Sequence, residues 1–317
     1  MMRTTENYIG LIGFGSQGKA WALNLRDSGE NIAVFLRENS ASKKKAQELG
    51  FEVFEVKDLG KIKCDFYLLL IPDNEHAAFL EKNFSQLPLK SKIVYAHGFS
   101  VSHQKLAEKY PHFHHLLLAP KAIASEVRFQ FETQGKLLGV YTAKVADQTT
   151  EEEKYNVEDE LAHLGIKLGL TSIYASSFEE ETKADLFSEQ ALLCSLLPYG
   201  AKICFEKLVR EGIDPKLALL ECFLELRSIS KALVDLGPNE FFQLISPNAL
   251  LGSEKAQALL FDKAFEQKLD ILWNDIQSGD FQKTCERDVT NIRRDILQRF
   301  EQSPLTQTFN QLKEELS

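Results

Sequence analysis

The feature that most constrains this chain is a glycine-rich loop near its beginning, Gly13-Phe-Gly15-Ser16-Gln17-Gly18. A short apolar run at residues 8–12 precedes the loop, and an amphipathic stretch that stops at Gly29 follows it. Strand, tight turn and helix in this order form the dinucleotide-binding unit of a Rossmann fold, in which backbone amides and the helix N-terminus bind a pyrophosphate. We therefore predict a dinucleotide site here; a chance glycine-rich turn is the alternative.

The rest of the first half continues the alternation of strands and helices. Short apolar runs predict strands at residues 32–36, 66–71, 92–96 and 116–119, with helical patterns between several of them. Such alternation indicates a parallel sheet covered by helices. We expect a Rossmann-like α/β domain over residues 1–177.

From residue 178 onward, strand patterns nearly vanish. Long segments with apolar residues at helical spacing are interrupted at residues 212–215, 237–238 and 246–247, each of which contains proline. The second domain, residues 178–317, is therefore predicted to be all-helical. The polar tail from Gln302 onward is expected to fray.

Composition narrows the classes of function. The net charge of −9 and the lack of a large basic tract argue against binding to nucleic acid. No stretch reaches the roughly 18 uninterrupted apolar residues of a membrane span, and the first residues lack the apolar core of a secretory signal. We expect a cytoplasmic protein with no membrane partner. The five cysteines are widely spaced, mostly within apolar helical patterns, and are expected to be reduced thiols in the core.

The end of the second predicted strand indicates which dinucleotide is bound. An acidic residue at this position would bind the ribose hydroxyls of NAD. This chain instead has Arg37, with Ser40 and Ser42 close behind it, a combination suited to a 2′-phosphate. We predict NADPH as the cofactor. The alternative is that one of the serines caps a helix beside a solvated arginine.

Two pairs of carboxylates in the second half are each spaced four residues apart: Asp185 with Glu189, and Glu221 with Glu225. Each pair lies on one face of a predicted helix, where like charges repel. Leucine and phenylalanine residues surround the pairs, and buried like charges need a counter-ion. All-oxygen ligands then indicate a hard divalent cation such as Mg²⁺. Two such pairs suggest a site for two metal ions; solvated acidic faces are the alternative.

Taken together, these features resemble the ketol-acid reductoisomerase family, also called acetohydroxyacid isomeroreductases, in its shorter bacterial form. The resemblance covers nearly the whole chain. Besides the glycine loop, its motifs in this sequence are the segment 37–42, Ala96-His-Gly-Phe99, Ala119-Pro-Lys121, the segments 178–190 and 221–226, and Ile245-Ser246.

The resemblance implies an NADPH-dependent enzyme with two Mg²⁺ ions. Asp185 would bridge the ions, Glu189 would complete one site, and Glu221 with Glu225 would supply the other. Glu225 and Ser246 would also contact a small keto-acid substrate. Enzymes of this family move an alkyl group between adjacent carbons and reduce the new carbonyl with NADPH. They convert 2-acetolactate or 2-aceto-2-hydroxybutyrate to a 2,3-dihydroxy acid in branched-chain amino-acid synthesis.

The resemblance also implies a homodimer or a larger homo-oligomer with shared active sites. In the shorter members of the family the helical domain is knotted, and Glu221, Glu225 and Ser246 would reach the metals from the partner subunit. Composition alone does not indicate this assembly.

His97 and Lys121 match a histidine and a lysine that lie near the nicotinamide and the metals in the family. Without the resemblance, a histidine before a glycine and a lysine after a proline read as residues that satisfy the backbone or lie in solvent. The group His-Phe-His-His at residues 112–115 matches no family motif, and we interpret it as strand-edge histidines rather than metal ligands.

The chain departs from the family where Ala122-Ile123-Ala124 replaces the usual Gly-Pro-Gly, which adds bulk near the reacting centre. Further departures spare the expected metal ligands; they lie at Ser188, Ser195, Leu196, Leu224 and Pro247-Asn248. Two alternatives therefore stay open. One is a related NADPH reductase of another 2-keto or 2-hydroxy-3-keto acid, and the other is a non-catalytic paralogue.

Overall fold

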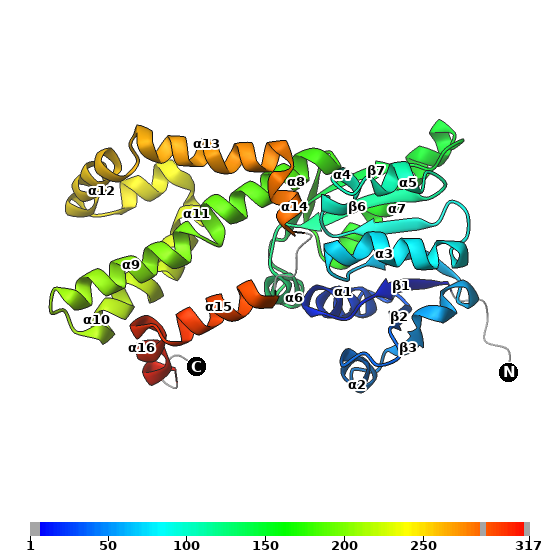
Figure 1. Cartoon of the computed structure of the whole chain (residues 1–317), viewed down its shortest axis with the longest axis horizontal. Coiled ribbons are helices and arrows are strands. Elements are labelled where there is room, and N and C mark those ends of the chain that lie inside the picture. The colour runs from blue at the N-terminus through cyan, green and yellow to red at the C-terminus, as the bar shows by residue number, and fades with distance from the viewer. Residues whose placement is uncertain (1–6, 286–289, 314–317) are drawn as a thin grey trace. The chain divides into compact units, whose positions relative to one another are not determined.

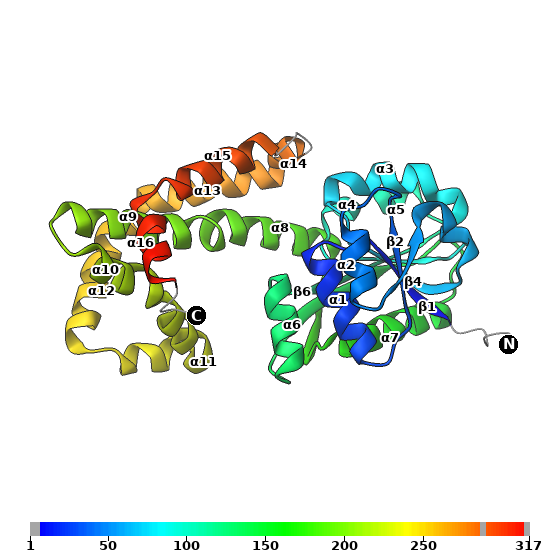
Figure 2. The ribbon, with the colours of Figure 1, turned by 90° about the horizontal axis from the view of Figure 1, so that it is seen from below.

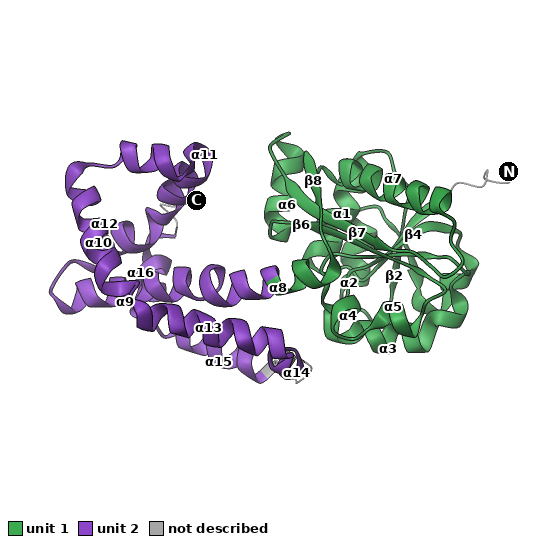
Figure 3. Ribbon diagram, turned by 90° about the horizontal axis from the view of Figure 1, so that it is seen from above, with its two compact units in different colours: residues 1–183 green, residues 184–317 purple. Residues whose placement is uncertain are grey.

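The computed structural model describes residues 7–285 and 290–313. The chain divides into a first unit, residues 1–183, and a second unit, residues 184–317 (Figure 3). The division falls inside one helix, α8 (Phe178–Ser188). Among the described residues, no helix combines the length and apolar character that crossing a bilayer requires.

The first unit is built on an eight-stranded sheet with the order β3-β2-β1-β4-β5-β6-β7-β8. The strands are β1 (Tyr8–Ile12), β2 (Ile32–Leu36), β3 (Glu52–Glu55), β4 (Cys64–Leu69), β5 (Lys92–Tyr95), β6 (His114–Pro120), β7 (Leu138–Lys144) and β8 (Ser172–Ala175). The first six are mutually parallel in the order of a Rossmann fold, which confirms the predicted architecture. The last two differ from the prediction, because β7 runs antiparallel to β6 and carries β8 parallel to itself.

Helices cover both faces of this sheet (Figures 1 and 2). One face carries α3 (Asp73–Asn83), α4 (Phe99–Ser102) and α5 (Leu106–Lys109), and the other carries α1 (Ser16–Asp27), α6 (Ala124–Glu132) and α7 (Glu151–Leu168). The short helix α2 (Ser42–Glu48) follows β2. The 3₁₀ turns η1 (Val56–Lys61) and η2 (Phe84–Gln86) complete this unit.

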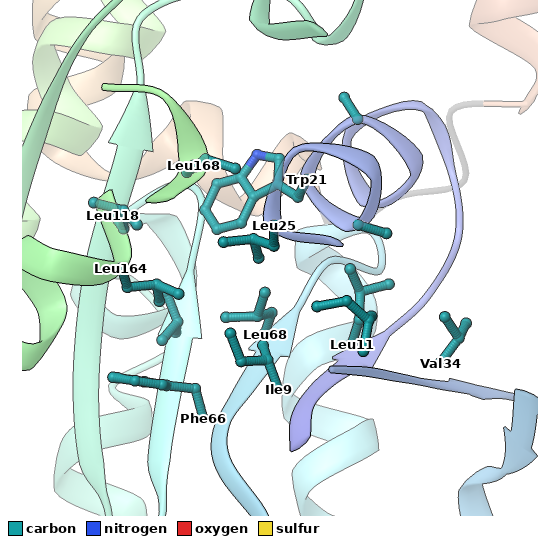
Figure 4. Packing of buried hydrophobic residues seen from close by; sticks show 14 of the residues in the cluster. Ile9, Leu11, Trp21, Leu25, Val34, Phe66, Leu68, Leu118, Leu164 and Leu168 are labelled. Atoms are coloured by element: carbon teal, nitrogen blue, oxygen red, sulfur yellow. The ribbon is translucent and has the colours of Figure 1, made fainter. Parts of the chain in front are cut away.

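Each face of the sheet has its own apolar core. On the α1 and α7 face, Trp21 and Leu25 pack with Leu164 and Leu168 against the apolar side chains of the strands (Figure 4). Trp21 and Leu25 are fully buried, and burying a large apolar side chain stabilises a fold by about 1.5–3 kcal/mol. The two cores fix the ends of the strands, where the polar residues described below lie.

Two of the three histidines of the 112–115 group, His114 and His115, lie inside the sheet rather than at its edge, which corrects the interpretation from sequence. His114 and His115 are buried on β6, a strand with neighbours on both sides. The Nε2 of His115 lies 3.0 Å from the Tyr110 carbonyl, and its Nδ1 lies 2.9 Å from the Tyr95 hydroxyl. A carbonyl only accepts, so Nε2 carries the proton and donates it, while Nδ1 accepts from the hydroxyl. Burial lowers the pKa of His115 to about 4.

The described part of the second unit is entirely helical, as predicted. Its helices after α8 are α9 (Leu196–Arg210), α10 (Pro215–Leu219), α11 (Leu226–Leu244), α12 (Pro247–Leu260), α13 (Lys263–Ser278), α14 (Asp280–Cys285), α15 (Thr290–Glu301) and α16 (Pro304–Leu312). Two short π-helical turns, η3 (Glu189–Leu193) and η4 (Leu220–Leu224), interrupt the α-helical pattern.

All three predicted breaks in this unit are found. Pro215 begins α10, which Asp214 caps by accepting from the Lys216 amide at 2.9 Å, and Pro247 begins α12. At the third break, Gly237 adopts the non-helical angles φ 77° and ψ 165°, so α11 consists of two helical segments that meet at a kink.

Two expectations about the second unit were wrong. The tail does not fray over residues 304–312, because α16 buries Leu305 and Leu312; residues 314–317 lie outside the described part. The thiols of Cys194 and Cys204 are exposed rather than in the core, while those of Cys64 and Cys222 are half-buried. The side chain of Cys285 lies outside the described residues.

Candidate functional site

The glycine loop needs glycine for a different reason at each position. Gly13 has φ +95°, and a Cβ there would lie 2.8 Å from the Leu70 carbonyl oxygen. A Cβ on Gly18 would lie 2.6 Å from the Gly13 carbonyl oxygen, so glycine allows α1 to begin directly against the loop. Gly15 has no atom within 4 Å of its ideal Cβ, which leaves the backbone open to a ligand.

The first turn of α1 is suited to an anion. Gly15 is the N-cap, no side chain caps the helix, and no acidic residue lies in the first turn. Its backbone amides and the positive end of the helix dipole can therefore accept a phosphate. Ser16 and Gln17, the other predicted cofactor contacts, lie in this same turn.

The segment that begins at Arg37 forms a compact turn after β2. The Ser40 amide donates to the Arg37 carbonyl at 3.0 Å, and the Ser42 amide donates to the Ser40 hydroxyl at 3.3 Å. Ser42 is the first residue of α2. The Arg37 side chain is 83% exposed and its Nη1 lies 3.9 Å from Glu75 Oε2. The structure thus brings a cation and two hydroxyls together at the end of β2.

A polar cluster at the carboxyl ends of β5 and β6 is centred on Glu181 of α8. Its Oε1 accepts from the Lys121 ammonium at 2.6 Å, and its Oε2 accepts from the Gly98 amide at 2.7 Å. The same Oε2 lies 3.0 Å from His97 Nδ1. His97 and Lys121 follow neighbouring parallel strands, so the fold places them at one edge of the sheet.

The Glu181 carboxylate is held in its charged form. Only 1% of its side chain is exposed, and burial by itself would raise its pKa. The hydrogen bond and charge of His97, together with the Lys121 ammonium, outweigh burial and lower the pKa of Glu181 to about 2. The carboxylate in turn fixes the Lys121 ammonium, whose side chain is 37% exposed, at the open side of the cluster.

Gly98 makes this arrangement possible. A Cβ on Gly98 would lie 2.4 Å from the Phe178 carbonyl oxygen and 3.0 Å from Glu181 Oε2. Only glycine therefore lets the turn after β5 approach the first turns of α8. The glycine in the motif His97-Gly98-Phe99 is thus a steric requirement of the cluster.

One contact links this cluster to the glycine loop. The Gln17 side-chain amide on α1 donates to the Ala122 carbonyl at 3.4 Å, next in the chain to Lys121. The Gln17 Oε1 is buried and has no partner among the described residues. The glycine loop and the loop that carries Lys121 therefore lie side by side at one end of the sheet.

Glu181 was missed as a site residue by reasoning from the sequence. The signal was present, because Glu181, Asp185 and Glu189 are spaced four residues apart and extend one carboxylate face along a helix. The side-chain ligand atoms of His97, Glu181 and Asp185 lie within 4.8 Å of one another. Among the described residues, no other group of three such side chains meets this criterion.

The three other carboxylates that were predicted as metal ligands are Glu189, Glu221 and Glu225. Glu189 begins η3, Glu221 lies in η4, and Glu225 caps α11; all three are exposed in the single chain. The sequence argument that apolar neighbours bury them was therefore wrong for this chain alone, because Leu193 and Leu220 beside them are about half exposed as well. That each pair shares one face of its helix stays a prediction.

Ser246 has a local structural role that the sequence analysis did not assign to it. Its hydroxyl accepts from the Ala249 amide at 3.2 Å and caps α12. Its predicted contact with substrate stays a prediction.

A sheet with this strand order, a glycine loop at the point where the order reverses and a polar cluster at the adjoining strand ends define a dinucleotide-dependent oxidoreductase. Sequence comparison gives the particular family. Residues 4–159 match the acetohydroxy acid isomeroreductase NADPH-binding domain, and residues 178–317 match the ketol-acid reductoisomerase C-terminal domain. The chain belongs to the ketol-acid reductoisomerase family and is an enzyme of the NADP-dependent oxidoreductase and isomerase type.

Individual relatives agree. The chain is 34% identical over 278 residues to "Ketol-acid reductoisomerase (NADP(+))" of Helicobacter acinonychis, covering 87% of this chain and 82% of that protein. It is 31% identical over 313 residues to the protein of the same name from Corynebacterium aurimucosum, covering 98% and 91%.

Solved structures share the fold. An NADH-preferring ketol-acid reductoisomerase from an uncultured archean superposes with a TM-score of 0.86 at 23% identity, covering 97% of this chain and 94% of that chain. A semialdehyde dehydrogenase NAD-binding protein from Cupriavidus necator superposes with a TM-score of 0.63 at 15% identity, covering 86% and 99%.

Proposed function

We propose that this protein uses NADPH and Mg²⁺ to convert 2-acetolactate, or its homologue 2-aceto-2-hydroxybutyrate, to the 2,3-dihydroxy acid. The observation that carries the proposal is the Lys121–Glu181–His97 cluster beside the glycine loop. A reductoisomerase needs a nicotinamide next to groups that hold a substrate oxygen and its proton. The cluster offers these groups at the strand ends where such folds bind cofactor and substrate.

For the cofactor, the glycine loop would bind the pyrophosphate, and Arg37, Ser40 and Ser42 would bind the 2′-phosphate. The open space at Gly15 and the first turn of α1, with no acidic residue, support the first assignment. The exposed guanidinium of Arg37 and the two hydroxyls beside it support the second.

The donor set fits a hard divalent cation. Glu181 is held by an ammonium, an imidazole and an amide, and Asp185, one turn further along α8, adds a second carboxylate to this group. We propose Asp185 and Glu189 as ligands of one Mg²⁺, with Glu221 and Glu225 serving the second. Such ions supply concentrated positive charge that polarises a carbonyl and stabilises an alkoxide.

The chain's own residues would handle orientation and protons. The hydrogen bond from Lys121 to Glu181 fixes the position of the Lys121 ammonium, which would donate a further hydrogen bond to a substrate oxygen. His97 contacts the same carboxylate through Nδ1, which fixes the plane of its ring. Because Glu181 is deeply buried and charged, it positions both groups without itself exchanging a proton near neutral pH.

We further propose that the protein is a homodimer or larger homo-oligomer whose second units associate. Neither α11 nor α12 has a buried residue in the single chain, although both are rich in apolar side chains. The exposed ones include Leu233, Val234, Leu236, Phe242, Leu244, Leu250, Leu251, Leu259 and Leu260. Apolar surface on this scale needs a partner, and a second copy brings the same surface. The knot and the cytoplasmic location also remain proposals.

Shared sites can be tested by mixing two inactive variants. If Asp185 and Glu221 of different subunits form one site, Asp185→Asn and Glu221→Gln are each inactive alone. Hybrids made by co-expression would then regain activity, because one of their two sites has both carboxylates. A fully active monomer, or hybrids as inactive as their parents, would refute the shared site.

One observation favours a second candidate substrate. Ile123 is 73% exposed and follows Lys121 by two residues in the chain, so it adds an exposed apolar side chain to the loop that carries Lys121. A related NADPH reductase of another 2-keto or 2-hydroxy-3-keto acid, such as hydroxypyruvate, is the corresponding alternative.

One assay separates these functions. Purified protein is given acetolactate or hydroxypyruvate with NADPH or NADH, with and without Mg²⁺, and absorbance at the reduced-nicotinamide band is followed. The proposal expects NADPH oxidation with acetolactate only when Mg²⁺ is present. Faster turnover of hydroxypyruvate supports the alternative substrate, and NADPH binding without any turnover supports a non-catalytic paralogue.

A further inference from the structure

A carboxylate lies beside the arginine that is assigned to the cofactor. Glu75 Oε2 is 3.9 Å from Arg37 Nη1, and 45% of the Glu75 side chain is exposed. Glu75 lies in the first turn of α3, which follows β4, whereas Arg37 follows β2. In the sheet, β2 and β4 flank β1, so these two residues stand on either side of the strand that leads into the glycine loop.

We propose that Glu75 is a specificity-determining residue that lowers the preference of this enzyme for NADPH over NADH. The inference rests on the proposed binding of the 2′-phosphate at Arg37. Glu75 would compete with the 2′-phosphate for the guanidinium and would repel the phosphate charge directly. NADH lacks this phosphate, so its binding does not meet this opposition.

The charges around Glu75 make this assignment specific. Glu38, the acidic residue that directly follows Arg37, exerts its charge on Lys57. Asp73, in the same turn of α3 as Glu75, lies 3.8 Å from His76 Nδ1. On α2, Lys44 pairs with Glu48 at 3.7 Å. Among the described residues, Glu75 is the carboxylate that forms an ion pair with Arg37.

Glu75 also supplies a carboxylate near the end of β2, where this chain lacks the acidic residue of NAD-dependent folds. In NAD-dependent folds an acidic residue at this strand end accepts hydrogen bonds from the ribose hydroxyls. Here the strand end supplies a cation, and the carboxylate comes from the next helix of the neighbouring βα unit. Arg37 can bind the 2′-phosphate of NADPH, while Glu75 offers a hydrogen-bond acceptor to the ribose hydroxyls of NADH, which has no 2′-phosphate.

The size of the effect follows from the exposure of the pair. Exposed ion pairs are weak and are screened by salt, so removing the charge of Glu75 is expected to tighten NADPH binding about two- to fivefold at low ionic strength. The change should shrink markedly in 0.5 M NaCl, and the affinity for NADH should stay the same or weaken.

The experiment measures cofactor binding to the full-length protein, without substrate or metal. Dissociation constants for NADPH and NADH are determined by titration calorimetry for the wild type, Glu75→Gln and Glu81→Gln at low and high salt. Glu81 is an exposed glutamate further along α3, so Glu81→Gln makes the same charge change on the same helix away from Arg37. Support requires that NADPH binding tightens in Glu75→Gln alone.

The results that overturn the inference are distinct from those that overturn the proposed cofactor. If the wild type binds NADPH and Glu75→Gln leaves that affinity unchanged, the role of Glu75 is refuted while NADPH stands. Equal tightening for NADH, or equal tightening in Glu81→Gln, also refutes it. A folded wild type that binds no NADPH refutes the proposed cofactor, and this inference with it.

Discussion

The substitution Glu181→Gln removes a buried negative charge and keeps the shape of the side chain. Since each pKa unit corresponds to 1.36 kcal/mol, the fall in the pKa of Glu181 from 4.5 to about 2 corresponds to about 3 kcal/mol of folding free energy at neutral pH. This contribution is fully present above the unfolded pKa and is lost as the pH falls toward the folded one. By pH 3, about 2 of the 3 kcal/mol should be gone.

Urea denaturation of the wild type and Glu181→Gln, at pH 7 and at pH 3, measures this contribution. The fluorescence of Trp21, which is fully buried in the first unit, reports unfolding of that unit when Trp273 is replaced by phenylalanine in both proteins. The difference in unfolding free energy should be about 3 kcal/mol at pH 7 and about 1 kcal/mol at pH 3. Turnover should also fall, by about a hundredfold, because Lys121 and His97 lose their common anchor.

The matched control is Glu179→Gln. Glu179 lies in the same helix turn and accepts from Lys183 at 2.7 Å, but 71% of its side chain is exposed. Its replacement should change stability far less and leave turnover nearly intact. A Glu181→Gln protein as stable as the control at both pH values would refute the reasoning that the cluster holds this carboxylate charged.

Three further predictions concern other residues of the first unit. Gly98→Ala should lower the free energy of unfolding by about 1–3 kcal/mol and reduce kcat, because its Cβ would meet a carbonyl of α8. The control Gly200→Ala, at a position with open space around it, should do neither. Calorimetric melting and steady-state kinetics measure the two effects. Arg37→Asp combined with Ser40→Asp should shift the ratio of kcat/KM toward NADH, and an unchanged affinity for NADPH would contradict the assigned 2′-phosphate site. Burial lowers the pKa of His115 to about 4, so the unfolded chain binds a proton at this histidine more readily than the folded protein does. The free energy of unfolding should therefore decline as the pH falls from about 6.5 toward 4, and His115→Gln should reduce that decline in urea titrations.

The glycine loop and the central strands could be predicted from the sequence because their causes are local. A buried strand is a run of apolar residues, and the φ of Gly13 is a property of one residue. The edge strand β3 gave no such signal, because its side chains are exposed or half-buried and need no apolar run. The antiparallel direction of β7 depends on how the chain returns to the sheet, which no short pattern records.

The centre of the site could not be predicted from local patterns. Glu181 meets its partners across 60 residues to Lys121 and 83 residues to Gly98, so only the fold reveals the contact. The exposure of Glu221 and Glu225 was mispredicted for a related reason. Apolar neighbours in a sequence indicate burial, but they do not say whether the covering surface belongs to the same chain or to another copy.

The Lys121–Glu181 pair has an evolutionary consequence. Losing the lysine would leave a buried carboxylate without the ammonium that donates to it, so selection for folding alone retains both residues, even in a descendant that no longer turns over substrate. Glu221 and Glu225 are exposed in the single chain and carry no such folding constraint there. In a lineage drifting away from catalysis, these two positions would be expected to change first, and their identity in relatives is the more sensitive record of retained chemistry.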